Sequence, residues 1–227
     1  MINDGLGVKG RISEIFESIQ GEGVYQGIRQ LFIRFYGCNL TCKFCDTRLK
    51  SYQEYDLDRL IKKINSFKGK YHSLCLTGGE PLLQVDFLKE LLPKLKIRIY
   101  LETNGTLSKE LNKVIDMIEI VSMDIKLPSS TGLKGLWNEH KKFLKSALKK
   151  EVFVKTVICS STELRDLKEA VRLIKNFNKD IPFILQPNSF EIKRELIKKL
   201  IDFQEYSINY LSSVRIIPQI NKFLKLR

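Results

Sequence analysis

Three cysteines lie within eight positions of the chain, at Cys38, Cys42 and Cys45. Their C-x3-C-x2-C spacing lets three thiolates from one short loop ligate three corners of a cubane iron–sulfur cluster, leaving the fourth iron without a protein ligand. A structural zinc site would need a fourth Cys or His nearby. The closest candidate, His72, lies 27 positions beyond Cys45. The spacing therefore favours a 4Fe–4S cluster with one open, reactive iron.

The two remaining cysteines stand in a different setting. Cys75 lies between two leucines, and Cys159 follows a valine and an isoleucine. A cysteine in such a run is typically a small buried residue, so we predict that both are buried and that neither is a ligand. Five cysteines are an odd number, and nothing in the sequence indicates secretion. A disulfide framework is therefore not expected.

Short apolar runs rich in β-branched residues alternate with longer segments of helical period from residue 30 onward. This alternation is typical of parallel strands joined by crossover helices. A closed eight-unit barrel takes about 250 residues, and this chain has 227. We therefore predict an α/β fold, an incomplete TIM-type β/α barrel of about six to seven parallel strands. The predicted strands cover residues 30–36, 73–77, 97–101, 118–123, 152–158, 183–186 and 214–217.

Polar and glycine-containing segments directly follow most of these strands. Active sites of barrel folds lie at the C-terminal ends of the strands, so we expect these segments to form one site. Helix starts are predicted at Asp56, whose side chain can cap the following turn, at Ser108, and at the pair Ser161 and Thr162. The segments that follow the strands are residues 37–39, 78–81, 102–105, 124–126 and 186–188.

The chain length, the apolar runs and the net charge indicate the number of domains, the location of the protein and its class of partner. A single domain spanning residues 1–227 is expected, with the cluster loop at residues 37–47. The sequence has no run of about 18 apolar residues and no basic, then apolar, N-terminal segment, so a soluble cytoplasmic protein is expected. The formal net charge is +13, which can attract nucleic acid. The lysines and arginines are spread over helix-like segments, however, which favours a solvated lysine-rich surface over an RNA-binding face.

The cysteine loop resembles the hallmark of the radical S-adenosylmethionine superfamily, C-x3-C-x-aromatic-C, with Phe44 at the aromatic position. The expected companion motif, Gly78-Gly79-Glu80, follows the second predicted strand. In that superfamily this segment hydrogen-bonds the methionine amino group of the cofactor. A Gly-Gly pair alone would indicate only a turn, but the two motifs together imply a radical enzyme.

The resemblance narrows to the 7-carboxy-7-deazaguanine synthases and spans essentially the whole chain. The motifs are E-I-F-x-S-I-Q-G-E-G at residues 14–23, R-F-x-G-C-N-L at 34–40 and C-D-T at 45–47. These enzymes contract 6-carboxy-5,6,7,8-tetrahydropterin to a deazapurine on the route to queuosine and archaeosine. For Glu102, a helix-capping loop is the alternative. The pterin-binding residues that the resemblance implies are Ile19, Gln20, Gly21, Glu22, Arg34, Thr77 and Glu102.

The same resemblance assigns further roles. Thr47 would ligate a magnesium ion, and the alternative is a threonine that only caps a turn. Arg34 would pair with the substrate carboxylate, since a planar guanidinium can bind a carboxylate at two points. The alternative for Arg34 is a surface ion pair. The implied contacts to S-adenosylmethionine are Gly78, Gly79, Glu80, Ser122, Asp124, Lys126, Gln186, Pro187, Asn188 and Ser189.

Two departures from the family pattern lie near the C-terminus. Members commonly read Pro-Gln-x-His-Lys, whereas this chain has Asn221 in place of the histidine. An amide cannot titrate near neutral pH as an imidazole does, so proton transfer at this position is not expected. Some members end at a proline whose terminal carboxylate helps to close the substrate pocket. Arg227 stands at the corresponding place, and by resemblance its backbone carboxylate would serve there.

The implied activity converts the carboxylated tetrahydropterin to 7-carboxy-7-deazaguanine with loss of ammonia, in a pathway of tRNA modification. It would use a 4Fe–4S cluster, S-adenosylmethionine and Mg²⁺, in a homodimer that takes electrons from an external low-potential donor such as a flavodoxin. No membrane and no direct nucleic-acid partner is expected.

Two alternatives stay open at this point. One is a glycyl-radical enzyme activase, which also carries C-x3-C-x2-C, although the motifs at residues 14–23 and 45–47 argue against it. The other, from a different class, is a metal-containing RNA-binding module. The chain lacks the basic and aromatic strand signature that single-stranded RNA readers use for stacking.

Overall fold

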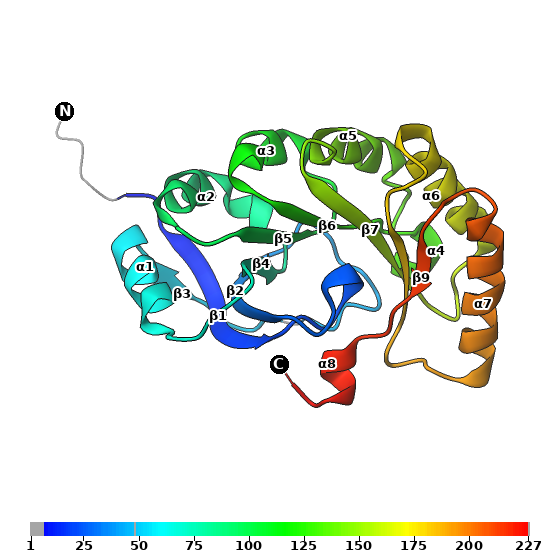
Figure 1. Cartoon of the computed structure of the whole chain (residues 1–227), viewed down its shortest axis with the longest axis horizontal. Coiled ribbons are helices and arrows are strands. Elements are labelled where there is room, and N and C mark those ends of the chain that lie inside the picture. The colour runs from blue at the N-terminus through cyan, green and yellow to red at the C-terminus, as the bar shows by residue number, and fades with distance from the viewer. Residues whose placement is uncertain (1–6, 48, 227) are drawn as a thin grey trace.

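The computed structural model describes residues 7–47 and 49–226. Within them the chain forms one nine-stranded sheet in the order β3-β1-β2-β4-β5-β6-β7-β8-β9. Figure 1 shows α1 to α7 around the outside of this curved sheet, and α8 on its own near the C-terminus. The strands are β1 (Gly10–Ile19), β2 (Arg29–Phe35), β3 (Gln53–Tyr55), β4 (Leu74–Gly78), β5 (Ile99–Thr103), β6 (Ile120–Asp124), β7 (Glu151–Ile158), β8 (Phe183–Pro187) and β9 (Val214–Ile216).

Helices connect the parallel strands. No helix in the described ranges is long and apolar enough to cross a membrane. Four short 3-10 helices are η1 (Gly23–Tyr25), η2 (Pro81–Gln84), η3 (Leu92–Lys94) and η4 (Ile115–Met117). The α-helices are α1 (Leu57–Ser66), α2 (Val85–Leu91), α3 (Ser108–Asn112), α4 (Pro128–Thr131), α5 (Trp137–Ala147), α6 (Leu164–Phe177), α7 (Arg194–Ile208) and α8 (Ile220–Phe223).

The strands β2 and β4 to β9 run parallel to one another. They correspond to the seven strands predicted from the sequence, with shifted ends. The sheet does not close into a barrel, because β3 and β9 are its two edges. The prediction of an incomplete barrel is therefore confirmed.

Two strands were not predicted. β1 pairs antiparallel with β2, and the short β3 pairs antiparallel with β1. β1 packs on both faces, with Ile15 against the outer core and Phe16 on the inner face, but polar and charged residues interrupt its apolar positions. A search for continuous apolar runs passes over such a strand, and β3 has only three residues, all polar or aromatic.

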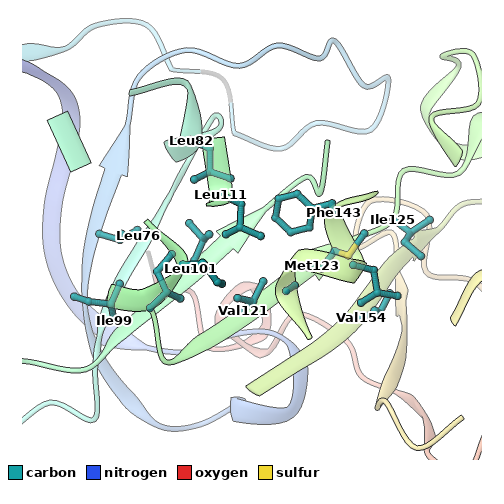
Figure 2. Close-up of a cluster of buried hydrophobic side chains, with 14 of the residues drawn as sticks. Leu76, Leu82, Ile99, Leu101, Leu111, Val121, Met123, Ile125, Phe143 and Val154 are labelled. Atoms are coloured by element: carbon teal, nitrogen blue, oxygen red, sulfur yellow. The ribbon is translucent and has the colours of Figure 1, made fainter. Parts of the chain in front are cut away.

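The outer face of the sheet and the helices enclose the main core. Parallel strands covered by helices are buried on both faces, so their sequences are almost continuously apolar. Figure 2 shows Leu76, Leu101 and Val121 from adjacent strands gathered with Leu111 of α3 and Phe143 of α5. All five side chains are fully buried.

The inner face carries a separate apolar layer, which we call the barrel floor. Side chains on one face of a strand recur every second residue. In β2 and in β4 to β8, the residue two positions after the floor residue therefore also faces inward. Those six residues are Arg34, Thr77, Glu102, Ser122, Lys155 and Gln186. The polar interior is thus built directly on the floor, which consists of Phe16, Phe32, Cys75, Tyr100, Ile120, Phe153 and Ile184.

The predicted helix starts are confirmed in part. Asp56 caps α1, where its Oδ1 accepts a hydrogen bond from Arg59 N at 2.8 Å. Ser108 is the first residue of α3 but does not cap it, because the preceding residue occupies the cap position. Thr162 lies just before α6 and serves the turn after β7 instead, since its Oγ1 accepts a hydrogen bond from Cys159 N at 2.7 Å.

Leu101 provides a test of the outer core. Leu101→Ala should lower the free energy of unfolding by about 2–5 kcal/mol, because it removes buried methyl groups and leaves a cavity. The measurement is urea unfolding followed by circular dichroism. Leu164→Ala on α6 is the control: Leu164 is 40% exposed, and a surface change should shift stability by about 0.5 kcal/mol or less. Equal losses in the two variants would contradict this packing.

Candidate active site

The cysteine loop leaves the end of β2 and packs closely against the end of β4. Gly79 N donates a hydrogen bond to Phe35 O at 3.0 Å, and Glu80 N donates one to Gly37 O at 2.8 Å. A Cβ atom on Gly79 would lie only 2.0 Å from Gly37 O. Glycine is therefore required at position 79 for the backbone to approach the loop, and the loop is held without using its thiols.

All three cysteines of the loop line one cavity at the C-terminal ends of the strands, which we call the cofactor cavity. Burial raises the pKa of the Cys38 and Cys42 thiols, so a metal must displace their protons when it binds. Leu40 N lies 3.4 Å from Cys38 Sγ and donates to it, which favours the thiolate. Three thiols on one loop fit the ligand set of a 4Fe–4S cluster.

The other two cysteines are buried, as predicted. Cys75 is 0% exposed and Cys159 is 3% exposed. Cys75 belongs to the barrel floor, whereas Cys159 Sγ accepts a hydrogen bond from Asn188 Nδ2 at 3.6 Å. Among residues 7–47 and 49–226, no group of three or more His, Cys, Asp or Glu side chains is arranged to hold a single metal ion.

The cofactor cavity contains two buried acceptors that suit S-adenosylmethionine. Asp124 Oδ1 and Gln186 Oε1 have no hydrogen-bond partner within the described part of the chain. A buried acceptor without a partner is costly, and the ammonium and ribose hydroxyls of S-adenosylmethionine are donors. The predicted cofactor contacts that line this cavity are Gly78, Gly79, Asp124, Lys126, Gln186, Pro187, Asn188 and Ser189.

A row of alternating charges crosses the cavity. Lys126 Nζ lies 2.8 Å from Asp124 Oδ2, and Lys155 Nζ lies 3.4 Å from the same oxygen. Lys155 also pairs with Glu22. Burial alone would raise the pKa of Asp124, but the two lysines bring it below its ordinary value. Burial would lower the pKa of Lys155, but Glu22 and Asp124 outweigh it and raise that pKa.

A second cavity, which we call the substrate cavity, adjoins the first. Arg34 Nε lies 2.9 Å from Glu14 Oε2, and its guanidinium carbon lies 5.4 Å from the ring centroid of Phe16. The ion pair considered as an alternative is therefore present, within the cavity wall. Every described residue predicted to bind the pterin lines this cavity: Ile19, Gln20, Gly21, Glu22, Arg34, Thr77 and Glu102.

Glu102 lies between neutral donors rather than beside a cation. Gln20 Nε2 donates to Glu102 Oε1 at 2.9 Å, and Thr77 Oγ1 donates to Glu102 Oε2 at 2.6 Å. Burial raises the pKa of Glu102, and the negative charge of Glu22 adds to the rise, whereas Lys155 opposes it. The capping role considered for Glu102 is not what these contacts show.

The two cavities have residues in common, which we call the shared wall. Its Thr47 Oγ1 donates to Asp46 Oδ1 at 3.2 Å, and Asp46 Oδ2 lies 3.1 Å from Lys222 Nζ. The two cavities are therefore bounded in part by the same side chains. Within the described ranges, the wall consists of Glu22, Asp46, Thr47, Thr77, Glu102 and Gln219.

Two residues predicted to contact the cofactor do not line its cavity. Glu80 is fully buried, and accepts hydrogen bonds from Asn104 N at 2.8 Å and from Thr103 Oγ1 at 3.0 Å. Burial raises the pKa of Glu80 to about 7. Ser122 lies beside Glu102 of β5 and beside Phe153 of β7. Because Phe153 is a floor residue, Ser122 lies at the level of the floor and not at the level of the cavity.

The C-terminal segment enters the site. Asn221 lines the substrate cavity, and its Oδ1 is buried without a partner in the part of the chain described here. Ile220 N donates to Gly21 O at 3.0 Å, which docks the segment on the loop after β1. Arg227, predicted to close the pocket, lies outside the described residues.

Four residues of the site were missed from the sequence. Lys155 interrupts the apolar run of β7 two positions after Phe153, and a lysine on the inner face of a buried strand is a readable signal of a buried ion pair. The other three residues, Asp46, Gln219 and Lys222, belong to the family motifs described above. Only the fold shows that Gln219 and Lys222 both contact Asp46.

Comparison with known proteins first defines the class. Residues 32–159 match the model of the Radical SAM superfamily. With the three-cysteine loop and the open, mostly parallel sheet, this match identifies a radical S-adenosylmethionine enzyme.

Similarity over the whole chain defines the family. The 7-carboxy-7-deazaguanine synthase of Geobacter sulfurreducens is 39% identical, over 94% of this chain and 96% of that protein. The one from Archaeoglobus fulgidus is 34% identical, over 97% and 100%. The crystal structure of QueE from Escherichia coli shares the fold, with a TM-score of 0.62 and 22% identity over 93% of this chain and 94% of that one. The chain belongs to the 7-carboxy-7-deazaguanine synthase family.

Lys155 provides a test of the buried charges. Lys155→Met should lower the free energy of unfolding by about 3–5 kcal/mol, because Glu22 loses its ion-pair partner and buried Asp124 keeps only Lys126. The two lysines hold the pKa of Asp124 below its ordinary value, so the loss should be smaller at about pH 3 than at about pH 7, where Asp124 is fully charged. Urea unfolding at both values measures this. The control is Lys150→Met, which removes an exposed lysine bonded to a carbonyl; a pH-independent loss in Lys155→Met would contradict the assignment.

Proposed function

We propose that this chain is a 7-carboxy-7-deazaguanine synthase, which converts 6-carboxy-5,6,7,8-tetrahydropterin to 7-carboxy-7-deazaguanine with loss of ammonia. The observation that carries the proposal is the shared wall. A cavity lined by the three cysteines adjoins one lined by an arginine, carboxylates and backbone amides. A cofactor bound in the first cavity and a substrate bound in the second would therefore lie next to each other, as direct hydrogen abstraction requires. The named relatives give no support to the activase or the RNA-binding alternative.

The cofactor cavity would hold the reactive group. When bound, the 4Fe–4S cluster and S-adenosylmethionine supply the one-electron cleavage that starts the reaction. Cys38, Cys42 and Cys45 would ligate the cluster. Asp124 and Gln186 would accept hydrogen bonds from the cofactor's ammonium and hydroxyl groups, which satisfies both of their orphaned oxygens.

The substrate cavity would orient the pterin. Glu14 holds the Nε side of the Arg34 guanidinium, and this directs the terminal nitrogens of the fork toward the substrate carboxylate. The bicyclic ring presents amide-like edges, for which Gln20 and Glu22 are suitable partners. The raised pKa of Glu102 lets this carboxyl retain a proton more readily, and so donate a hydrogen bond to a substrate oxygen.

We also propose that Thr47 ligates Mg²⁺ in the substrate complex. Thr47 lines both cavities, and its hydroxyl donates to the carboxylate of Asp46. Magnesium prefers oxygen ligands, and usually takes one or two from the protein with the rest from substrate and water. The donor set around Thr47 fits this ion, which would supply a Lewis acid beside the substrate carboxylate.

Partners follow from the same family. We propose a homodimer supplied with electrons by an external low-potential donor such as a flavodoxin, in a pathway to queuosine or archaeosine in tRNA. The support for self-association in this chain is an apolar stripe on α7, where Ile197, Ile201 and Ile208 are 41%, 45% and 56% exposed.

The experiment for the main proposal is anaerobic reconstitution with iron, sulfide, S-adenosylmethionine and the carboxylated tetrahydropterin, with products identified by mass spectrometry. The deazapurine and 5′-deoxyadenosine should both form. Cys42→Ala should abolish both products, because it removes a cluster ligand. The matched control is Cys75→Ala, a thiol of the floor that should keep the cluster and lose only stability. Cofactor cleavage at the wild-type rate in Cys42→Ala would overturn the proposal.

The magnesium proposal has its own test. Thr47→Val keeps the shape of the side chain and removes its oxygen, so the variant should keep its fold and cluster absorbance. It should lose most turnover, and the response of turnover to added magnesium should flatten. Thr106→Val is the matched comparison, since Thr106 lines neither cavity. An unchanged magnesium response in Thr47→Val would leave Thr47 as a residue that only caps its turn.

A further inference from the structure

Gln219 joins three segments that are far apart in the sequence. Its Nε2 donates to Glu22, in the loop after β1, and also to Asp46 Oδ2, in the cysteine loop, at 3.3 Å. Its Oε1 accepts from the hydroxyl of Ser189, which follows β8. One side-chain amide therefore contacts a residue predicted to bind the pterin, a residue predicted to bind the cofactor, and the neighbour of Thr47.

These partners fix the orientation of the amide. Two carboxylates can only accept hydrogen bonds, so the NH₂ group must face them. The carbonyl oxygen then faces the hydroxyl donor. The reverse orientation would set an oxygen against both carboxylates and leave the hydroxyl facing NH₂. Any movement of Ser189 or of Glu22 is thus transmitted to the other through a group with one favourable arrangement.

The backbone beside Gln219 is anchored on the substrate side. Pro218 O accepts from Gln26 Nε2 at 2.5 Å, and Ile220 N donates to Gly21 O at 3.0 Å. On the cofactor side, side chains make the contacts to the loop after β8: the Gln219 amide bonds to Ser189, and Lys222 Nζ lies 5.9 Å from the ring centroid of Phe190. The C-terminal segment therefore has a backbone anchor near β1, and its Gln219 amide makes the hydrogen bond to a residue predicted to bind the cofactor.

We infer that Gln219 is a positioning residue that makes the binding of cofactor and substrate cooperative, an inference that rests on the proposed function. S-adenosylmethionine on the loop after β8 holds Ser189, and through the amide it holds Glu22 in its binding position. The pterin then binds to a Glu22 side chain that is already ordered. The second ligand therefore does not lose the conformational entropy of ordering that side chain again. By linkage, each ligand must raise the affinity for the other by the same factor.

The test measures affinity rather than activity. Calorimetry on the cluster-loaded, unreduced protein gives the dissociation constant of S-adenosylmethionine with and without the carboxylated tetrahydropterin, and the reverse. The wild type should show a coupling factor of about 5 or more. Gln219→Leu should bring the factor close to one, and Ser189→Ala should lower it by removing only the carbonyl's partner. The matched control is Gln204→Leu, a glutamine of α7 that bonds to Val214 O and should leave the factor unchanged.

The possible results distinguish a wrong substrate from a wrong role for Gln219. A wild type that binds S-adenosylmethionine but not the pterin would refute the proposed substrate, and the inference with it. A wild type that binds both without coupling refutes the inference alone. A coupling factor in Gln219→Leu equal to the wild type, with both affinities lowered alike, would show a merely structural role. If Gln219→Leu does not fold, as judged by circular dichroism and cluster absorbance, an unchanged factor in Ser189→Ala overturns the inference.

Discussion

Side chains on the inner face of a strand recur at every second residue, and the site depends on this spacing throughout. One residue of β2 and of each strand from β4 to β8 enters the apolar floor, and the residue two positions further along the strand carries a polar group. Because the parallel strands end at the same rim, the polar groups of separate strands converge without any loop having to place them. Ser122 shows the limit of the pattern: the stagger between neighbouring strands sets it beside Phe153, below the cavity.

Placing so many charges above an apolar floor requires that they be matched. Lys155 lies between Glu22 and Asp124, and Lys126 completes the row. Removing ions from water is expensive, and their mutual attraction recovers this only in good geometry. The row therefore contributes a fixed field in the cavities more than it contributes net stability. Preorganised charges of this kind need not reorient when a ligand arrives.

Features that depend on residues close together in the sequence could be predicted, whereas few contacts between distant segments could. The cysteine spacing, the Gly78-Gly79 turn and the apolar runs of the seven parallel strands are local patterns, and each was correctly placed. β1 was missed because charged and polar residues interrupt its apolar positions, so it lacks a continuous apolar run. Glu80 was predicted to contact the cofactor; its carboxylate accepts hydrogen bonds from Thr103 and Asn104, and the contact to the cofactor stays a prediction. The meeting of Gln219 with Asp46 spans 173 positions, and no local pattern specifies such a contact.

The shared wall also limits how this enzyme can change over evolution. A substitution in the wall, for example at Thr77 or Glu102, alters two binding sites at once, so a variant that accepts a new substrate there risks losing the cofactor that every substrate needs. Phe16, Phe32 and Leu49 line the substrate cavity without reaching the other one. Lineages that acquire a different substrate preference should therefore diverge first at such apolar positions, and keep the wall nearly invariant. Directed evolution that samples these positions before the wall would follow the same order.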